Sequence, residues 1–293
     1  MSNQGDVIKK VDFQKTWPEG WKVSYGFDLI EIYGLNNRCG HFFSYTTRMG
    51  KVLDLIQQVI PPNAKVLDIA AAQGNYSLSL AELGYDVTWN DIRSELADYV
   101  KLKYEHGTIH FAPGNILEID FNHSYDLCLM GEIVEHVAYP DRLLKRVIQL
   151  IKPGGYIIMT TPNGSYFRSR GHRFSKCLNP SKFENTQFKS DADGHIFLLH
   201  LDEIYSLAQT IGLRVVKTLL INNCLTNGDM RLGWLLKFLP SAVVKTIEQF
   251  TQGLPFSIQE KLNSCIIVLF KRLEGCDKLE KGVREEPWPK KSF

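Results

Sequence analysis

Residues Val66-Leu67-Asp68-Ile69-Ala70-Ala71-Ala72-Gln73-Gly74-Asn75 form an apolar run that passes directly into a loop of very small side chains. Lys65–Ala70 has the length and composition of a buried strand, and Tyr76–Leu83 follows it as a helix. A second strand, Asp86–Ile92, brings Asp91 to its end. Ligands of open parallel sheets bind at the carboxyl ends of the strands, where small residues let the backbone approach closely. The loop and Asp91 therefore predict a nucleoside site.

The same alternation of strand-like and helix-like segments continues along the chain. Further strands are expected at Thr108–Ala112, Tyr125–Met130, Tyr156–Thr161, Leu213–Ile221 and Ser264–Lys271. Helices are expected at Thr47–Ile60, Ser94–Tyr104, Asp141–Ile151 and Leu201–Ile211, and Lys152-Pro153-Gly154-Gly155 reads as a turn. This order predicts an α/β fold with a mostly parallel sheet and helices on both faces.

Three regions follow from this pattern. Residues 1–60 are an aromatic and helical segment, which we expect to form a lid over the ligand site. Residues 61–272 form the main domain, with insertions at 165–194 and 229–259 that break the alternation. Residues 273–293 are charged and contain two prolines, which predicts a flexible tail.

The composition excludes several classes of protein. The chain is 44% hydrophobic and 23% charged, with a formal net charge of +2, so no global field favours nucleic acid or an anionic membrane. The six cysteines include no Cys-x-x-Cys pair, which suits reduced thiols better than disulfides or a zinc site. Neither a signal peptide nor a membrane-spanning apolar run is visible, so we expect a cytoplasmic protein without stable membrane insertion.

The residues of the loop indicate which nucleoside-containing cofactor the site would bind. A dinucleotide site has the same layout, but it requires three glycines around a pyrophosphate, whereas this loop has only Gly74. Asp68 would also repel a pyrophosphate, while its negative charge suits an ammonium or sulfonium group. These two features favour S-adenosylmethionine over NAD.

At this point the order and spacing of several segments resemble class I S-adenosylmethionine-dependent methyltransferases. The resemblance is strongest to the branch of the ubiquinone-biosynthesis O-methyltransferases, and it extends to bacterial sugar and secondary-metabolite methyltransferases. It rests on Val66–Ala70, Asn90-Asp91, Gly131–Val137, Leu150–Tyr156, Thr161–Asn163 and His195–Phe197. It implies a Rossmann-like, doubly wound seven-stranded sheet, mostly parallel with an antiparallel last strand, an N-terminal helical lid and a helical insertion before the last strand.

The resemblance also implies cofactor-binding residues. Arg48 would take the methionine carboxylate, Asp91 the ribose hydroxyls and Asn115 the adenine amino group. The whole expected set is Arg48, Asp68, Ala70, Gly74, Asp91, Ile92, Asn115, Ile116, Met130 and Gly131. The sequence departs from the family at Ala70 and Ala72, where the family usually has glycine.

The candidates for chemistry cluster in Glu132-Ile133-Val134-Glu135-His136 and at His195. On a helix, Glu132, Glu135 and His136 would share one face. One hypothesis makes His136 or His195 the general base for a hydroxyl acceptor, with Glu132 beside it. A second makes Glu132, Glu135, His136 and His195 ligands of a divalent metal, as in the small-RNA 2′-O-methyltransferases that the segment resembles. A third gives the segment a packing role only.

The expected function is methyl transfer from S-adenosylmethionine to a small molecule, most simply to a hydroxyl of a sugar or secondary metabolite. The basic, aromatic run Phe167–Phe174 would clamp a phosphate or carboxylate of the acceptor, or else form a solvated surface loop. The alternatives are a metal-dependent RNA 2′-O-methyltransferase, which the near-neutral charge disfavours, and a non-catalytic cofactor-binding scaffold. The 229–259 segment is the candidate surface for a homodimer.

Overall fold

The computed structural model describes residues 8–33, 40–121, 124–187, 194–230, 236 and 238–274. The predicted tail (273–293) lies almost wholly outside this part of the chain, as do 188–193 of the first insertion and 231–235 and 237 of the second. The boundaries of the three predicted regions therefore stay predictions.

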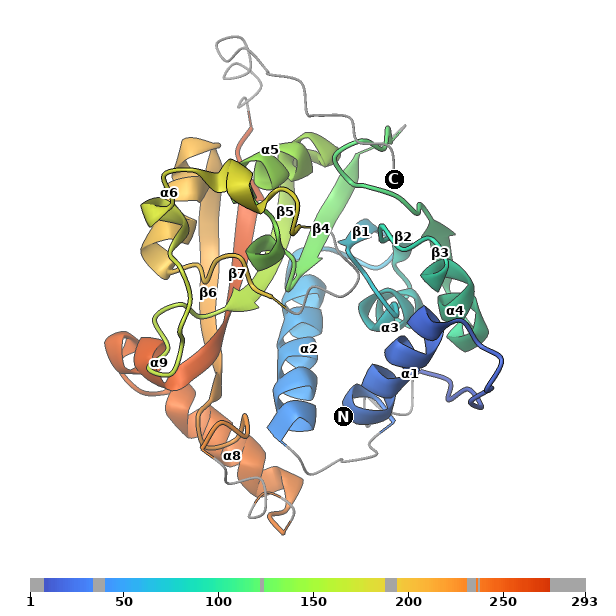
Figure 1. Cartoon of the computed structure of the whole chain (residues 1–293), viewed down its shortest axis with the longest axis horizontal. Helices are drawn as coiled ribbons and strands as arrows, with labels where there is room; N and C mark the ends of the chain where they lie inside the picture. The colour runs from blue at the N-terminus through green and yellow to red at the C-terminus, as the bar shows by residue number, and fades with distance from the viewer. Residues whose placement is uncertain are drawn as a thin grey trace.

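Seven strands form one sheet in the order β3-β2-β1-β4-β5-β7-β6 (Figure 1). They are β1 (Lys65–Ile69), β2 (Asp86–Asn90), β3 (Thr108–Phe111), β4 (Tyr125–Gly131), β5 (Ile151–Pro162), β6 (Leu213–Asn223) and β7 (Asn263–Arg272). Strands β1 to β5 pair in parallel, whereas β7 runs antiparallel to both β5 and β6. The predicted mostly parallel sheet with an antiparallel last strand is confirmed.

The helices are α1 (Glu19–Glu31), α2 (Gly40–Val59), α3 (Asn75–Glu82), α4 (Leu96–Lys103), α5 (Pro140–Leu150), α6 (Leu201–Thr210), α8 (Ser241–Gln252) and α9 (Phe256–Leu262). Short 3-10 turns occur at η2 (Val134–His136), η3 (Phe174–Lys176) and η4 (Pro180–Phe183). The helical insertion predicted before the last strand corresponds to α8 and α9. In Figure 1, α1 and α4 lie side by side at one end of the molecule, and α8 and α9 lie at the other.

Two hydrophobic layers hold the helices on the sheet. Successive side chains of a strand point to opposite faces. Accordingly, Val66 and Leu127 pack in the layer that contains α2, α3 and α4. Their neighbours Leu67 and Cys128 pack in the layer that contains α5 and α6. Because both faces of the central strands are covered, most residues of these strands are apolar, as expected for a doubly wound sheet.

The sequence-based boundary of β5 was wrong. The predicted turn at 152–155 lies inside the strand, which begins at Ile151 opposite Tyr125. The pairing with β4 is irregular between Tyr125 and Leu127, and Gly154 has a φ of +78°. A bulge that uses a glycine with positive φ lets the strand continue through residues that resemble a turn.

Helix α1 of the predicted lid is joined to the main domain by a buried polar network. The Nζ of Lys103, on α4, lies 2.6 Å from Oδ2 of Asp28, and both side chains are fully buried. The hydroxyl of Tyr99 donates to the same oxygen at 2.7 Å, and the amide of Asn75 donates to Oδ1 at 2.9 Å. A buried ion pair with additional hydrogen-bond donors restricts the geometry of the groups it joins. This network therefore fixes α1 next to the first residue of α3.

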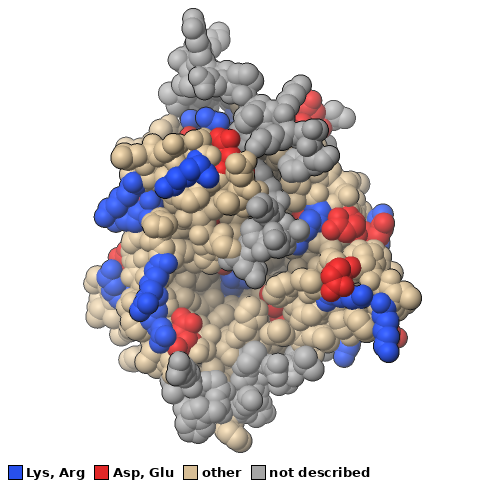
Figure 2. Space-filling view, in the orientation of Figure 1, with Lys and Arg blue, Asp and Glu red and all other residues tan. Residues whose placement is uncertain are grey.

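None of the helices in the described ranges is long and apolar enough to cross a membrane. On the face drawn in Figure 2, blue and red side chains are interspersed around a central hollow, and no field of a single sign covers its described part. This distribution agrees with the near-neutral formal charge.

Candidate functional site

The loop after β1 forms a tight turn at the carboxyl end of the sheet. The amide of Ala71 donates to the carbonyl of Asn90, at the end of β2, and the amide of Gly74 donates to Ala71. Ala70, Ala72 and Gly74 all have positive φ, at +54°, +48° and +73°. A Cβ on Gly74 would lie 2.7 Å from Cγ2 of Val100. Both this lack of space and the positive φ therefore require glycine at this position. The two alanines adopt the backbone conformation of the glycines that the family usually has there.

Replacing Ala70 or Ala72 by glycine is expected to raise the free energy of unfolding by about 0.5 kcal/mol each, because relief of the left-handed conformation, which costs a residue with a Cβ about 1–2 kcal/mol, outweighs the entropic cost of glycine of about 0.5–1 kcal/mol. Urea unfolding of the single variants measures this change. Ala71→Gly is the matched control, since Ala71 is not among the described residues with positive φ. It should instead lower stability by about 0.5–1 kcal/mol. Equal effects at all three positions would contradict the strain at Ala70 and Ala72.

Asp91 lies directly after β2, and its carboxylate is engaged from two sides. The amide of Ala72 donates to Oδ2 at 2.9 Å, and the amide of Arg93 donates to Oδ1 at 2.9 Å. The guanidinium of Arg93 reaches both oxygens, with Nε at 2.9 Å from Oδ1 and Nη2 at 3.0 Å from Oδ2. Asp91, which the sequence predicts to bind a ribose, therefore orients the loop at Ala70–Gly74. It is itself held by Arg93, which the sequence analysis did not identify.

Asp68 is buried at the end of β1, under the start of α3. The hydroxyl of Ser77 donates to its Oδ2 at 2.6 Å. Burial raises the pKa of Asp68 to about 7, although the hydrogen bonds from Ser77 lower it and the charge of Asp91 raises it further. The carboxylate that the sequence predicts beside a cationic ligand thus titrates near neutral pH when no such ligand is bound.

Because the pKa of Asp68 is raised, the folded state binds its proton more tightly than the unfolded state. Between the ordinary pKa near 4 and the folded value near 7, stability is lost as pH rises, by about 1 kcal/mol between pH 5 and pH 6. Asp68→Asn should remove this contribution, so its advantage over wild type grows across that interval. Chemical unfolding at pH 5 and pH 6 measures it, with the exposed Asp98→Asn as control. A constant difference between Asp68→Asn and wild type would contradict the raised pKa.

The predicted adenine side of the site is built around backbone contacts. The amide of Asn90 donates to the carbonyls of Ala112 and Gly114 at 2.7 and 3.0 Å, which fixes the loop after β3 beside Asp91. Asn115 accepts the amide of Leu117 at 3.1 Å and donates to Glu118 at 3.1 Å. The remaining members of the expected set line the same edge: Ile92 and Gly131 are half-buried, and Ile116 and Met130 are buried.

Arg48, on α2, lies at the carboxyl end of β4. Its Nη1 is 3.0 Å from Oε2 of Glu132, and its guanidinium stacks over the ring of Tyr45. Its Nε is buried without a hydrogen-bond partner. Burial lowers the pKa of Arg48, but Glu132 together with Tyr76, Cys265 and Tyr45 outweighs that effect and raises the pKa well above its ordinary value. Arg48, which is predicted to bind the methionine carboxylate, is thus paired with the carboxylate of Glu132.

The predicted common helical face of Glu132, Glu135 and His136 was wrong. Glu132 has a φ of +52°, and only Val134–His136 forms a 3-10 turn. The side chain of Glu132 therefore turns toward Arg48 and accepts the hydroxyl of Thr160 at 2.7 Å. A short strand-to-helix junction cannot hold the spacing of an α-helix, and this separates Glu132 from the other two residues.

Glu135, His136 and His195 come together instead. Each offers a ligand atom within 4.8 Å of the others. The two imidazole rings meet edge to face, with centroids 5.1 Å apart, and Nε2 of His136 lies 3.9 Å from Oε1 of Glu135. His195 reaches this place because the amide of Ile196 donates to the carbonyl of Glu135 at 2.8 Å. The structure thus brings together three of the four predicted residues, which are up to 60 positions apart in the sequence.

Glu135 is the buried member of this cluster. Its Oε2 accepts the hydroxyl of Thr161 at 3.1 Å, whereas its Oε1 is buried without a hydrogen-bond partner. Burial, and secondly the charge of Glu132, raises its pKa well above the ordinary value. An unpartnered buried carboxylate oxygen beside two imidazoles is the kind of group that a proton or a cation would satisfy.

The threonines that hold the two glutamates were missed from the sequence. Thr160 and Thr161 are consecutive residues near the end of β5, and they reach Glu132 and Glu135 respectively. The signal was available, because β4 and β5 are adjacent parallel strands whose ends meet at the ligand edge. The pair Thr160-Thr161 therefore belongs to the same site.

Comparison with known proteins agrees with this arrangement. Residues 42–218 match the family described as "Methyltransferase domain". Among curated relatives, the ubiquinone biosynthesis O-methyltransferase of Rickettsia canadensis is 26% identical over 40% of this chain and 58% of its own length. That of Xanthomonas axonopodis is 31% identical over 35% of this chain and 45% of its own length. The chain thus spans about half the length of the curated relatives it matches.

Solved structures share the fold at low sequence identity. A SAM-dependent methyltransferase from Methanosarcina mazei is 20% identical, with a TM-score of 0.50 over 75% of this chain and 97% of that one. Coclaurine N-methyltransferase is 15% identical, with a TM-score of 0.50 over 76% of this chain and 72% of its own. The [4+2]-cyclase SpnF is 13% identical, with a TM-score of 0.50 over 88% and 97%. This fold is therefore not confined to one reaction.

Proposed function

Because the chain belongs to the family of methyltransferase domains, we propose that it transfers a methyl group from S-adenosylmethionine to a hydroxyl of a small molecule, such as a sugar or secondary metabolite. The single observation that carries the choice of a hydroxyl is the Glu135–His136–His195 cluster at the ligand edge of β4 and β5. A hydroxyl of high pKa needs a group that removes its proton before it can attack the methyl carbon.

In this proposal the cofactor lies along the carboxyl ends of β1, β2 and β4. Asp91 accepts the ribose hydroxyls in competition with Arg93, and the loop at Ala70–Gly74 approaches through its backbone. The methionine carboxylate binds Arg48, where it competes with Glu132. Cofactor binding is therefore coupled to a rearrangement of Glu132 next to the catalytic cluster.

The His136–His195 pair supplies the general base. Glu135 would stabilise the imidazolium that forms when the acceptor proton is taken, because a positive charge 3.9 Å from its unpartnered Oε1 favours the ionised form of a carboxyl group whose pKa burial raises. Methyl transfer from a sulfonium needs little further activation, so the protein otherwise aligns the two reactants.

A divalent metal is the second candidate, favoured by one specific observation. One carboxylate oxygen and two imidazole nitrogens within 4.8 Å of one another fit a three-ligand site, and the orphaned Oε1 of Glu135 would gain a partner. Glu132, the fourth predicted ligand, is held by Arg48 and Thr160. A metal bound there would lower the pKa of the acceptor hydroxyl.

Isothermal titration with S-adenosylhomocysteine and methyl transfer to a panel of hydroxyl and amine acceptors test the proposal together. We expect 1:1 cofactor binding and transfer to hydroxyl acceptors. Cofactor binding without transfer to any acceptor would favour the cofactor-binding scaffold, and absence of cofactor binding would contradict the proposal. Activity that disappears with chelator and returns with Mg²⁺ or Mn²⁺ would favour the metal over the base.

A further inference from the structure

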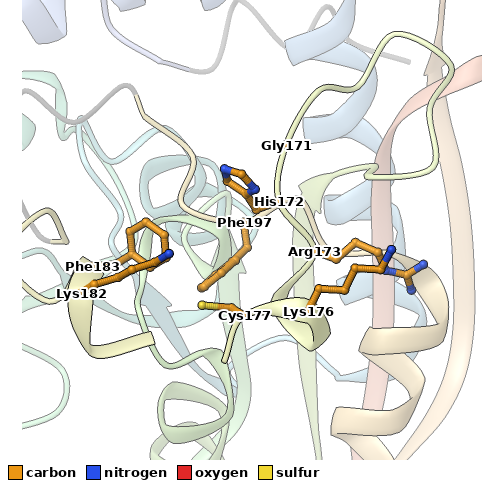
Figure 3. Close-up of a pocket in the computed structure, with 8 residues that line it drawn as sticks. All are labelled: Gly171, His172, Arg173, Lys176, Cys177, Lys182, Phe183 and Phe197. Carbon is orange, nitrogen blue, oxygen red and sulfur yellow. The ribbon is translucent and has the colours of Figure 1, made fainter. Parts of the chain in front are cut away.

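The first insertion lines an open cavity of ≈ 270 Å³ (Figure 3). It is formed by the chain around η3 and η4 and by Phe197 from the segment before α6. Nothing in the cofactor site uses it. Pockets for drug-sized ligands start at about 300 Å³, so this one suits a single ring or a smaller fragment.

The charged side chains that line the cavity are all basic, and one imidazole accompanies them: Arg173, Lys176 and Lys182, with His172. Arg173 is fixed by hydrogen bonding to Asp202 and lies 3.6 Å from Glu203, at the start of α6. Lys176 and Lys182 are exposed, and within the described ranges no carboxylate lies within 4.0 Å of either Nζ. The cavity therefore has two uncompensated cations among the residues described.

The remaining walls are apolar. Phe197 is fully buried and meets the ring of Phe183 edge to face, with centroids 5.5 Å apart. The Nζ of Lys182 lies 4.8 Å from the centroid of Phe183. Figure 3 shows Phe197 between Lys182 and Phe183 on one side and Arg173 and Lys176 on the other. Cations flanking aromatic rings suit a ligand with an anionic group and an apolar body.

The cavity and the catalytic cluster share one segment of chain. The amide of Phe197 donates to the carbonyl of Glu135 at 3.3 Å, and His195 lies two residues earlier. The amide of Leu198 donates to the carbonyl of His172 at 3.0 Å, which ties the insertion to the same segment. One wall of the cavity, Phe197, therefore belongs to the segment that carries His195 and is hydrogen-bonded to Glu135.

We propose that this cavity binds an anionic group, a phosphate or a carboxylate, carried by the methyl acceptor. The inference rests on the proposed function, since it names the class of acceptor for that site. Lys176 and Lys182 contact the anion, and Phe183 and Phe197 contact the ring or chain that bears it. The insertion is then the part of the protein that selects the acceptor.

Binding is tested on the full chain with phenyl phosphate and benzoate as probes and phenol as the neutral comparison. One of the two anions should bind more tightly than phenol, and the tighter one identifies the group. In the double variant Lys176→Gln/Lys182→Gln, that binding should weaken by at least about tenfold. The control Lys217→Gln/Lys245→Gln removes the same charge from exposed lysines elsewhere. Equal weakening in both variants, or no preference for an anion, would overturn the site.

The role in catalysis is tested with paired hydroxyl acceptors that differ only in carrying the anionic group. The charged member should have the lower KM with wild-type protein, and Lys176→Gln/Lys182→Gln should remove that advantage. Anion binding without any acceptor preference would overturn the assignment to the acceptor. S-adenosylhomocysteine binding is measured on the same samples. If S-adenosylhomocysteine does not bind, only the proposed function is contradicted. If S-adenosylhomocysteine binds but neither anion does, only this inference is contradicted.

Discussion

Replacing Asp91 by alanine is expected to weaken S-adenosylhomocysteine binding by about a hundredfold or more, because hydrogen bonds to a charged acceptor contribute about 1.5–3 kcal/mol each. The loss has two sources. The ribose hydroxyls lose their acceptor, and the amide of Ala72 loses the carboxylate that fixes the cofactor loop. Isothermal titration of Asp91→Ala measures the affinity, and thermal unfolding verifies that the variant is folded.

Arg93→Ala separates a direct role of Asp91 from an indirect one. Arg93 holds both carboxylate oxygens, at 2.9 and 3.0 Å, and so competes with a ribose for them. Its removal should leave the affinity unchanged or raise it severalfold, since a competing donor is lost. If Arg93→Ala weakens binding as much as Asp91→Ala does, then Asp91 acts by positioning Arg93 and does not itself bind the ribose. The exposed Asp98→Ala is the neutral control.

The fold was predictable from the sequence because its determinants are local. Short apolar runs such as Lys65–Ile69 alternate with amphipathic segments, and the mostly parallel direction of the strands follows from that alternation and the resemblance. The main error, the turn at 152–155, concerns a bulge whose residues are those of a turn. Propensity cannot distinguish the two, because the choice depends on the neighbouring strand.

The sequence indicated several residues that the structure brings close together, but not how their side chains pair. The sequence indicates Arg48, Glu132, Glu135, His136 and His195 together, but it places Glu132 with the histidines. Glu132 pairs with Arg48 because Glu132 has a positive φ and because α2 lies beside it. The helical spacing of residues predicts neither of these features. Arg93 was missed for the same reason, since ion pairs depend on tertiary contacts. The basic run Phe167–Phe174 was singled out from the sequence, but the cavity that it lines with Lys176, Lys182 and Phe197 was not.

Replacing His136 or His195 by alanine is expected to lower kcat by about a hundredfold to ten-thousandfold, the range that general bases contribute. Cofactor affinity should stay within about twofold, because neither side chain is in the expected cofactor set. The measurement is kcat with saturating S-adenosylmethionine, beside titration with S-adenosylhomocysteine. The histidine that acts as the base should show the larger loss, and only its variant should lose the acidic limb of the pH profile of kcat.

Glu135→Gln provides the decisive comparison within the cluster. It keeps the shape of the side chain and the contact with Thr161, but it cannot stabilise an imidazolium or supply a carboxylate to a metal. In the base mechanism it should lower kcat by about tenfold or more, in proportion to the lost charge next to His136. In the metal mechanism activity should also become more sensitive to chelator. An unchanged kcat in Glu135→Gln and in both histidine variants would assign the cluster to packing, because Glu135 is the buried residue that joins the ends of β4 and β5 to the segment carrying His195.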